Sequence, residues 1–151
     1  MLIIWPPVTH IGFLLADNSR LARWSFDQQV RALGVTGPQA RLLLTLHRAP
    51  GENQGFYAER LEVEPITLCR MVDRLAEAGL VERRADPRDR RVWRLHLLPP
   101  ALPIVDRLAE IGQEVEREAL VHLDDEERDQ LVDSLRRLRE ALREDGRKQV
   151  A

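Results

Sequence analysis

The chain has 151 residues, of which 44% are hydrophobic and 32% charged, and its formal net charge is −2. That length suits one globular domain with a modest core. The single cysteine, Cys69, excludes an intramolecular disulfide framework and favours a reducing cytoplasm. The apolar opening MLIIWPPV is much shorter than the about 20 apolar residues that span a bilayer, so we expect a loose or docked arm and no membrane association.

Charge is segregated along the chain, although its sum is slightly acidic. Residues 81–96 contain six arginines and three acids, a net of +3, whereas residues 97–151 contain fourteen acids and nine basic residues, a net of −5. A basic stretch inside a mildly acidic chain indicates a local surface for nucleic acid.

The first part of the chain has helical periodicity. Apolar residues repeat with a helical spacing over residues 11–33, and Gly34 ends the pattern. Thr36 and Gln39 are spaced as a capping box for a leucine-rich helix that ends before Pro50. Asn53 is placed to cap a short helix that runs to Leu61.

The next helix has the clearest signals. Pro65 sits where a first-turn proline is tolerated, and Gly79 is placed to end the helix. Between them Leu68, Met71, Val72 and Leu75 form one apolar stripe, so this helix is expected to bury a single face.

After Gly79 the apolar period changes from helical to alternating. Trp93, Leu95 and Leu97 alternate with polar residues, which predicts a half-buried strand. Residues 81–84 are its expected partner, and Asp86-Pro-Arg-Asp-Arg-Arg91 is the expected turn, so the segment predicts a β-hairpin.

Two long helices are predicted beyond Pro99-Pro100. Asp124 and Glu127 form an acidic helix start between them. Both helices have apolar residues at spacings of 4, 3 and 4, which predicts an αα-hairpin with a coiled-coil-like seam; the stripes are Ile104, Leu108, Ile111 and Val115, and Leu131, Leu135, Leu138 and Leu142.

The two short helices, residues 53–61 and 65–78, have the spacing of a helix-turn-helix motif. The second helix would enter the major groove of DNA, with Thr67 and Arg70 able to hydrogen-bond at its N-terminal end. The full set of candidate DNA-binding residues on this helix is Pro65, Ile66, Thr67, Arg70 and Arg74. A solvated outer face is the alternative interpretation for a lone amphipathic helix.

The hairpin turn favours the DNA interpretation. Stability does not require three arginines in this turn, Arg88, Arg90 and Arg91. Exposed ion pairs with Asp86 and Asp89 would each contribute only about 0.2–1 kcal/mol. Arginine side chains suit a narrow, electronegative minor groove.

These residues resemble a known family. The run LEVEPITLCRMVDRLAEAGLVERRADPRDRRVWRLHL, residues 61–97, is similar to the winged-helix core of the MarR (multiple antibiotic resistance regulator) family. The acidic and arginine-rich wing, residues 86–91, is the most specific feature. The motif match covers residues 53–97, and the order of elements agrees over nearly the whole chain.

The resemblance implies a mainly α fold with a small β-hairpin wing, in a single domain over residues 1–151. A winged helix-turn-helix core at 36–98 would be flanked by dimerisation helices at 11–33 and 101–145. It also implies a homodimer, usually a repressor, that binds double-stranded DNA and in many members responds to small phenolic or aromatic acids. Candidate dimerisation residues are Leu14, Leu108, Ile111, Val115, Leu131, Leu135, Leu138 and Leu142.

The resemblance also assigns roles within the wing. Its minor-groove arginine falls on Arg88 or Arg90. Asp89 and Arg91 would brace the wing against the recognition helix, together with Asp73 or Arg74.

This sequence departs from the family pattern at two points. Glu62 stands where the family often has glycine, so either it adopts a strained conformation or the turn differs. Leu98-Pro99-Pro100 replaces the usual threonine followed by an acid or glycine, which predicts a stiffer connection to the last helices.

Other site chemistries have weaker support. Cys69 lies in the recognition helix, which is not where the family's redox-sensing cysteines are found. The four histidines have no metal-ligand spacing, so no metal or other cofactor is expected. Trp5, Trp24 and Trp93 could line an effector pocket, but core or dimer contact is the favoured interpretation. The resemblance implies an effector between the dimer arm and the winged helix, which makes Trp24 and Arg20 the residues of interest.

An enzyme is not expected, because the chain has no phosphate loop, nucleophile motif or acid pair in an apolar setting. The expected function is therefore a cytoplasmic, dimeric repressor that reads a pseudo-palindrome with half-sites about 10 base pairs apart. The alternative is a helical protein-interaction or oligomerisation module without DNA binding. The sequence leaves open the operator, the target genes, the effector and whether the regulator represses or activates.

Overall fold

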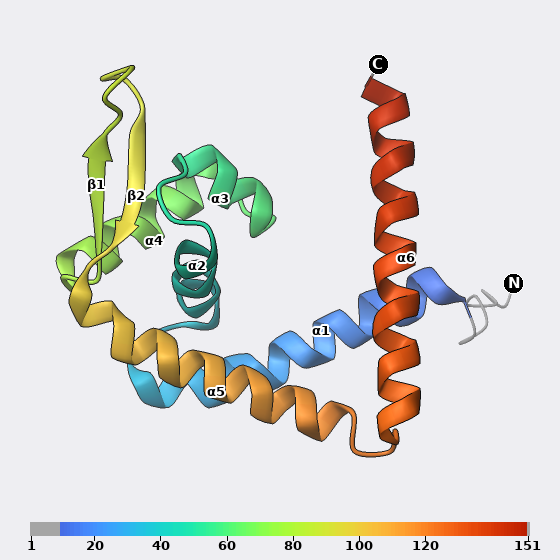
Figure 1. Ribbon diagram of the computed structural model, residues 1–151. Coiled ribbons are helices and arrows are strands. Elements are labelled where there is room, and N and C mark those ends of the chain that lie inside the picture. The colour runs from blue at the N-terminus through green and yellow to red at the C-terminus, as the bar shows by residue number, and fades with distance from the viewer. Residues whose placement is uncertain (1–9, 151) are drawn as a thin grey trace, which may run out of the picture. The chain divides into compact units, whose positions relative to one another are not determined.

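A computed structural model of the protein describes the backbone of residues 10–150 and the side chains as far as Glu144. The predicted N-terminal arm and Trp5 lie outside these residues. In chain order, the elements are α1 (Ile11–Val30), a 3₁₀ turn (Arg31–Leu33), α2 (Gly37–Arg48), α3 (Gln54–Arg60), α4 (Pro65–Glu77), β1 (Val81–Ala85), β2 (Trp93–Leu97), a second 3₁₀ turn (Pro99–Ala101), α5 (Leu102–Ala119) and α6 (Asp125–Val150) (Figure 1). The mainly helical class with one small hairpin is confirmed.

The chain divides into two compact units at Val115. The first contains α1 to α4, the hairpin and most of α5. The second contains the end of α5 and all of α6. Within the first unit, the hairpin stands beside α3 and α4, and α5 leaves from the base of β2 (Figure 1).

Local signals set the helix ends as predicted. The Thr36 side chain accepts the Gln39 amide, and the Gln39 side chain accepts the Thr36 amide, so the capping box is complete. Asn53 caps α3 through the Phe56 amide, and Pro65 occupies the first turn of α4. The acidic start of α6 is also reciprocal, with both bonds between Asp124 and Glu127 2.9 Å long.

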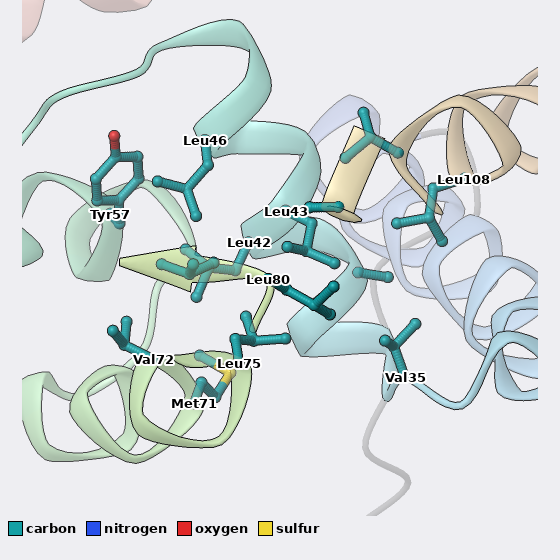
Figure 2. Close-up of a cluster of buried hydrophobic side chains, with 14 of the residues drawn as sticks. Val35, Leu42, Leu43, Leu46, Tyr57, Met71, Val72, Leu75, Leu80 and Leu108 are labelled. Atoms are coloured by element: carbon teal, nitrogen blue, oxygen red, sulfur yellow. The ribbon is translucent and has the colours of Figure 1, made fainter. Parts of the chain in front are cut away.

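The core of the first unit is built mainly from aliphatic side chains that face one another from α2, α4 and the strands. Figure 2 shows Leu42, Leu43 and Leu46 of α2 facing Val72 and Leu75 of α4, with Leu80 between them. The predicted stripe of α4 is therefore its core face, and all four of its residues are buried. This packing fixes which side of α4 remains open to solvent.

The predicted seam between the last two helices is wrong on the α5 side. Leu108, Ile111 and Val115 are buried in the core of the first unit, with exposed fractions of 0%, 3% and 8%. Their side chains are consequently not available for a seam with another helix or for contact with a second copy. Periodicity identified the apolar face correctly but assigned it the wrong neighbour.

The remaining predicted dimerisation residues lie at or near the surface. Leu14 on α1 and Leu131, Leu135 and Leu142 on α6 are exposed, while Leu138 is half-buried. Ile11, Leu15, Leu21 and Trp24 add further exposed apolar area on α1. A chain in solution rarely leaves so much apolar helix surface uncovered, so these faces favour association.

The hairpin has the predicted position, with β1 antiparallel to β2 and Arg84 opposite Arg94. Its alternation is less regular than predicted. Leu95 is fully buried and Leu97 is half-buried, but Trp93 is 49% exposed because it lies towards the tip, beyond the core.

Candidate nucleic-acid interface

The turn between α3 and α4 holds a strained residue. Glu62 has a φ of 54°, in the left-handed region that glycine occupies without steric cost. The Glu62 amide donates to Glu59 and the Val63 amide donates to Ala58, so the turn that glycine would favour forms with glutamate in its place. Of the two outcomes expected for Glu62, the structure shows the strained one.

The solvent-facing side of α4 presents the predicted reading residues. Its core face is buried, and on the other side Pro65, Ile66, Thr67, Arg70 and Arg74 are all exposed. The side chains of Arg70 and Arg74 form no hydrogen bond or ion pair within the described part of the chain. Ile66 is 61% exposed, so its side chain is accessible for apolar contact with a thymine methyl group.

The wing tip is shaped by its two aspartates. The Asp86 carboxylate accepts the Arg88 amide at 2.7 Å, and the Asp89 carboxylate accepts the Arg91 amide at 3.0 Å. Such Asx turns fold a short loop without using neighbouring side chains. The side chains of Arg88, Arg90 and Arg91 are exposed and have no partner among the described residues. They are therefore free to meet an external anion.

The base of the wing is fixed by Asp86 and Arg94. The Arg94 Nε donates to Asp86 at 2.5 Å, and its Nη1 donates to the Gly51 carbonyl at 2.8 Å. The Asp86 side chain is only 7% exposed. The Arg88 amide and then the Arg94 guanidinium hold the pKa of the Asp86 carboxyl below its ordinary value.

The loop before α3 lies along β2 as a third, strand-like segment. The Gly51 amide donates to the Leu95 carbonyl, the Leu95 amide donates to Glu52, and Asn53 forms an isolated bridge with Arg94. The buried Tyr57 hydroxyl donates to the Ala49 carbonyl and accepts the Glu52 amide. The wing is consequently anchored at its base, and only its tip projects.

The contact between the wing and α4 differs from the one inferred from the family. Asp73 of α4 pairs with Arg83 of β1 at 2.7 Å. Asp89 and Arg91, the expected brace, contact each other through the Arg91 amide within the tip, and Arg74 has no partner in the described region. Arg83 and Arg94 were not singled out from the sequence, and Asp86, which was expected to form only exposed ion pairs, is buried. No local pattern identifies the partners of Arg83, which lie 10 and 29 positions away along the chain.

A shallow apolar hollow lies between α1, α2 and α5. Its volume is about 250 Å³, and it is lined by Ala22, Arg23, Phe26, Arg41, Leu44, Gly112 and Val115. Arg41 is paired with Asp27 at 2.5 Å. Of the two residues considered nearest the effector position, Trp24 is 62% exposed and Arg20 pairs with Asp17, and neither lines the hollow.

No other site chemistry emerges from the described residues. They contain no group of three or more histidine, cysteine or acidic side chains placed to hold a metal ion. Among them, no helix is both long and apolar enough to cross a membrane. Cys69 is half-buried beside Arg83 and Asp73.

Comparison with known proteins points to one group. The sequence model of the MarR family matches residues 35–93, which run from α2 to the start of β2. A protein of Thauera aromatica, named as a transcriptional regulatory protein for the hcr operon, is 30% identical over 129 residues. The match covers 85% of this chain and 78% of that protein.

Solved structures of regulators from the same family are similar to this chain. A crystal structure of MarR superposes with a TM-score of 0.81 at 28% identity, over 94% of this chain and 97% of that one. The transcriptional regulator SlyA superposes with a TM-score of 0.77 at 26% identity, over 91% of this chain and 96% of its own. The similarity thus extends over nearly all helices and includes the wing.

Proposed function

Because the chain belongs to the MarR family of DNA-binding transcriptional regulators, we propose that it acts as a homodimeric repressor with a pseudo-palindromic operator. The observation that carries the proposal is the open face of α4 beside a wing whose three tip arginines have no side-chain partner among the described residues. The helix fits a major groove, and the wing tip fits the neighbouring minor groove. Such a regulator works in the cytoplasm, where its operator lies.

The exposed apolar faces of α1 and α6 support the dimer. Leu14 and Leu21 on α1 and Leu131 and Leu135 on α6 are each between 37% and 47% exposed in the single chain. A two-fold dimer would present two copies of α4 to one face of the duplex, about one helical turn apart.

Selection of bound duplexes from a random DNA pool tests this function. The proposal predicts an enriched pseudo-palindrome with half-sites about 10 base pairs apart, bound by two protomers. A reporter gene placed behind that operator should be silenced by the protein. No enrichment would favour the alternative, a helical interaction module, and an enriched site that increases reporter expression would identify an activator.

We also propose that the hollow between α1, α2 and α5 receives a small aromatic or phenolic effector. The lining is mainly apolar and contains two basic residues, Arg23 and Arg41. Arg23 has the weaker ion pair of the two. Its closest acidic atom, in Glu62, is 4.0 Å away, whereas Arg41 is held by Asp27. An occupant that moved α1 against α2 would change the separation of the two recognition helices, and with it the fit to the operator.

The effector proposal is tested by titrating the operator complex with benzoate and with phenol. Release of DNA by either compound should be weakened by Arg23→Gln. The matched control is Arg20→Gln, because Arg20 lies on the same helix but outside the hollow. Equal loss of response in both variants, or release that neither changes, would argue against this hollow as the effector site.

A further inference from the structure

Arg83 joins three elements through one guanidinium group. From β1, its Nε donates to the Gln54 side chain of α3 at 3.0 Å. Its Nη2 donates to Asp73 of α4 at 2.7 Å and approaches the carbonyl oxygen of Cys69 at 3.4 Å. The Arg83 side chain is 26% exposed and that of Asp73 is 52% exposed, so Arg83 is shielded from water more than its partner is.

This position matters because DNA must be contacted by two elements at once. The wing tip and α4 can each reach their groove only if the angle between them is held. The apolar contacts of Val81 and Leu95 at the base of the hairpin bring the elements together, but apolar contacts have little directionality. A planar guanidinium with donors in fixed directions does define an orientation.

The partners of Arg83 lie beside the reading face. Cys69 and Asp73 are one helical turn apart on α4, and the reading residues Arg70 and Arg74 directly follow them in sequence. Gln54 is the first residue of α3, the other helix of the helix-turn-helix motif. One side chain therefore ties the wing to both helices of the motif.

Arg83 is poorly placed to contact DNA itself. Its Nε and Nη2 are already engaged by protein groups. The tip residues Arg88, Arg90 and Arg91, in contrast, are exposed and unpaired within the described residues.

We propose that Arg83 is a positioning residue, which sets the angle between the wing and the recognition helix and so controls operator specificity without touching DNA. The inference rests on the proposed DNA-binding function. It predicts that losing Arg83 weakens specific binding, while leaving the electrostatic attraction to any duplex nearly unchanged.

The test compares Arg83→Gln with Arg84→Gln as a matched control. Arg84 is the next residue of the same strand, is more exposed, and within the described part of the chain its side chain is paired only with Glu82. Affinity for the selected operator and for an unrelated duplex is measured at several salt concentrations, with folding checked by circular dichroism. Arg83→Gln should weaken operator binding about 10- to 100-fold and leave both non-specific affinity and the salt slope unchanged.

Asp73→Asn reaches the same contact from α4 and keeps the proposal testable if Arg83→Gln folds poorly. It should give the same loss of specificity, and the double variant should be no worse than either single one. Operator binding as tight as wild type in Arg83→Gln would overturn the inference. So would a shallower salt slope, which would make Arg83 a phosphate contact. Failure of the wild-type protein to bind any duplex would instead remove the proposed function itself.

Discussion

At the scale of single residues, Glu62 occupies a backbone conformation that normally favours glycine. Its φ of 54° carries a steric cost that glycine avoids. We predict that Glu62→Gly raises the free energy of unfolding by about 0.5–1 kcal/mol, part of the relief being offset by the greater freedom of glycine in the unfolded chain. Urea denaturation measures this change.

Glu64→Gly is the matched control for that measurement. Glu64 is also exposed and carries the same charge, but its φ is −63°, which any residue adopts. Glycine there removes no strain and should leave stability unchanged or lower it. Equal effects of the two substitutions would show that charge, and not backbone strain, determines the response at Glu62.

Asp86 makes the wing sensitive to acid. Hydrogen bonds from the Arg88 amide and the Arg94 guanidinium lower its pKa in the folded state. A lowered pKa contributes stability that is fully present above the unfolded value of about 4 and is lost as pH falls through the folded value.

We therefore predict that Asp86→Asn destabilises the protein at pH 7 and that this difference from wild type shrinks as the pH falls below about 4. Unfolding curves collected across that range test the sign. Asp89→Asn is the control, because Asp89 is exposed and, among the described residues, its side chain accepts only the Arg91 amide in the tip. A wild-type advantage over Asp86→Asn that grows on acidification would contradict this account.

At the scale of elements, the α5 and α6 stripes look alike in sequence but have different surroundings. Leu108 is fully buried in the first unit, whereas Leu135 is 42% exposed. We predict that Leu108→Ala lowers the free energy of unfolding by about 2–5 kcal/mol, as expected for a truncated core leucine.

Leu135→Ala should behave differently. It should leave the secondary structure intact and shift the protein towards monomers in sedimentation experiments, because its side chain is free to contact a second copy. If Leu135→Ala sediments like wild type while Leu14→Ala does not, dimerisation uses α1 without this part of α6.

The elements that the sequence predicted well are those set by neighbours in the chain. Thr36 with Gln39, Asp124 with Glu127, and Pro65 act within one helical turn, so spacing alone revealed them. The function of the α5 stripe was missed because periodicity shows which face is apolar but not which element covers it.

The residues of the candidate site also fall into those that the sequence predicted and those that it did not. The exposed reading face of α4 follows from its own periodicity, since the buried stripe leaves only one side open. The wing brace does not, because Arg83 contacts residues that lie 10 and 29 positions away. Side chains that connect distant segments leave no spacing pattern in a single sequence.

At the scale of the whole molecule, positive charge is concentrated in one part of the chain. The chain has a net charge of −2, yet residues 81–96 contain three more arginines than acids. α6 itself is almost neutral, with eight acids and seven basic residues, so positive charge is concentrated at residues 81–96 and not on this helix. Binding is therefore expected to depend on a few wing residues far more than on total charge.

The most direct test of this account is a fluorescence anisotropy titration of the selected operator with wild-type protein and with Arg88→Ala/Arg90→Ala, at several salt concentrations. Arg136→Ala/Arg137→Ala on α6 is the control, since it removes the same charge from exposed positions outside the wing. The account predicts that wild-type affinity falls steeply with salt, and that the wing variant loses at least about 100-fold in affinity and has a shallower slope. Unchanged affinity in the wing variant, or an equal loss in the control, would contradict the claim that the wing tip holds DNA.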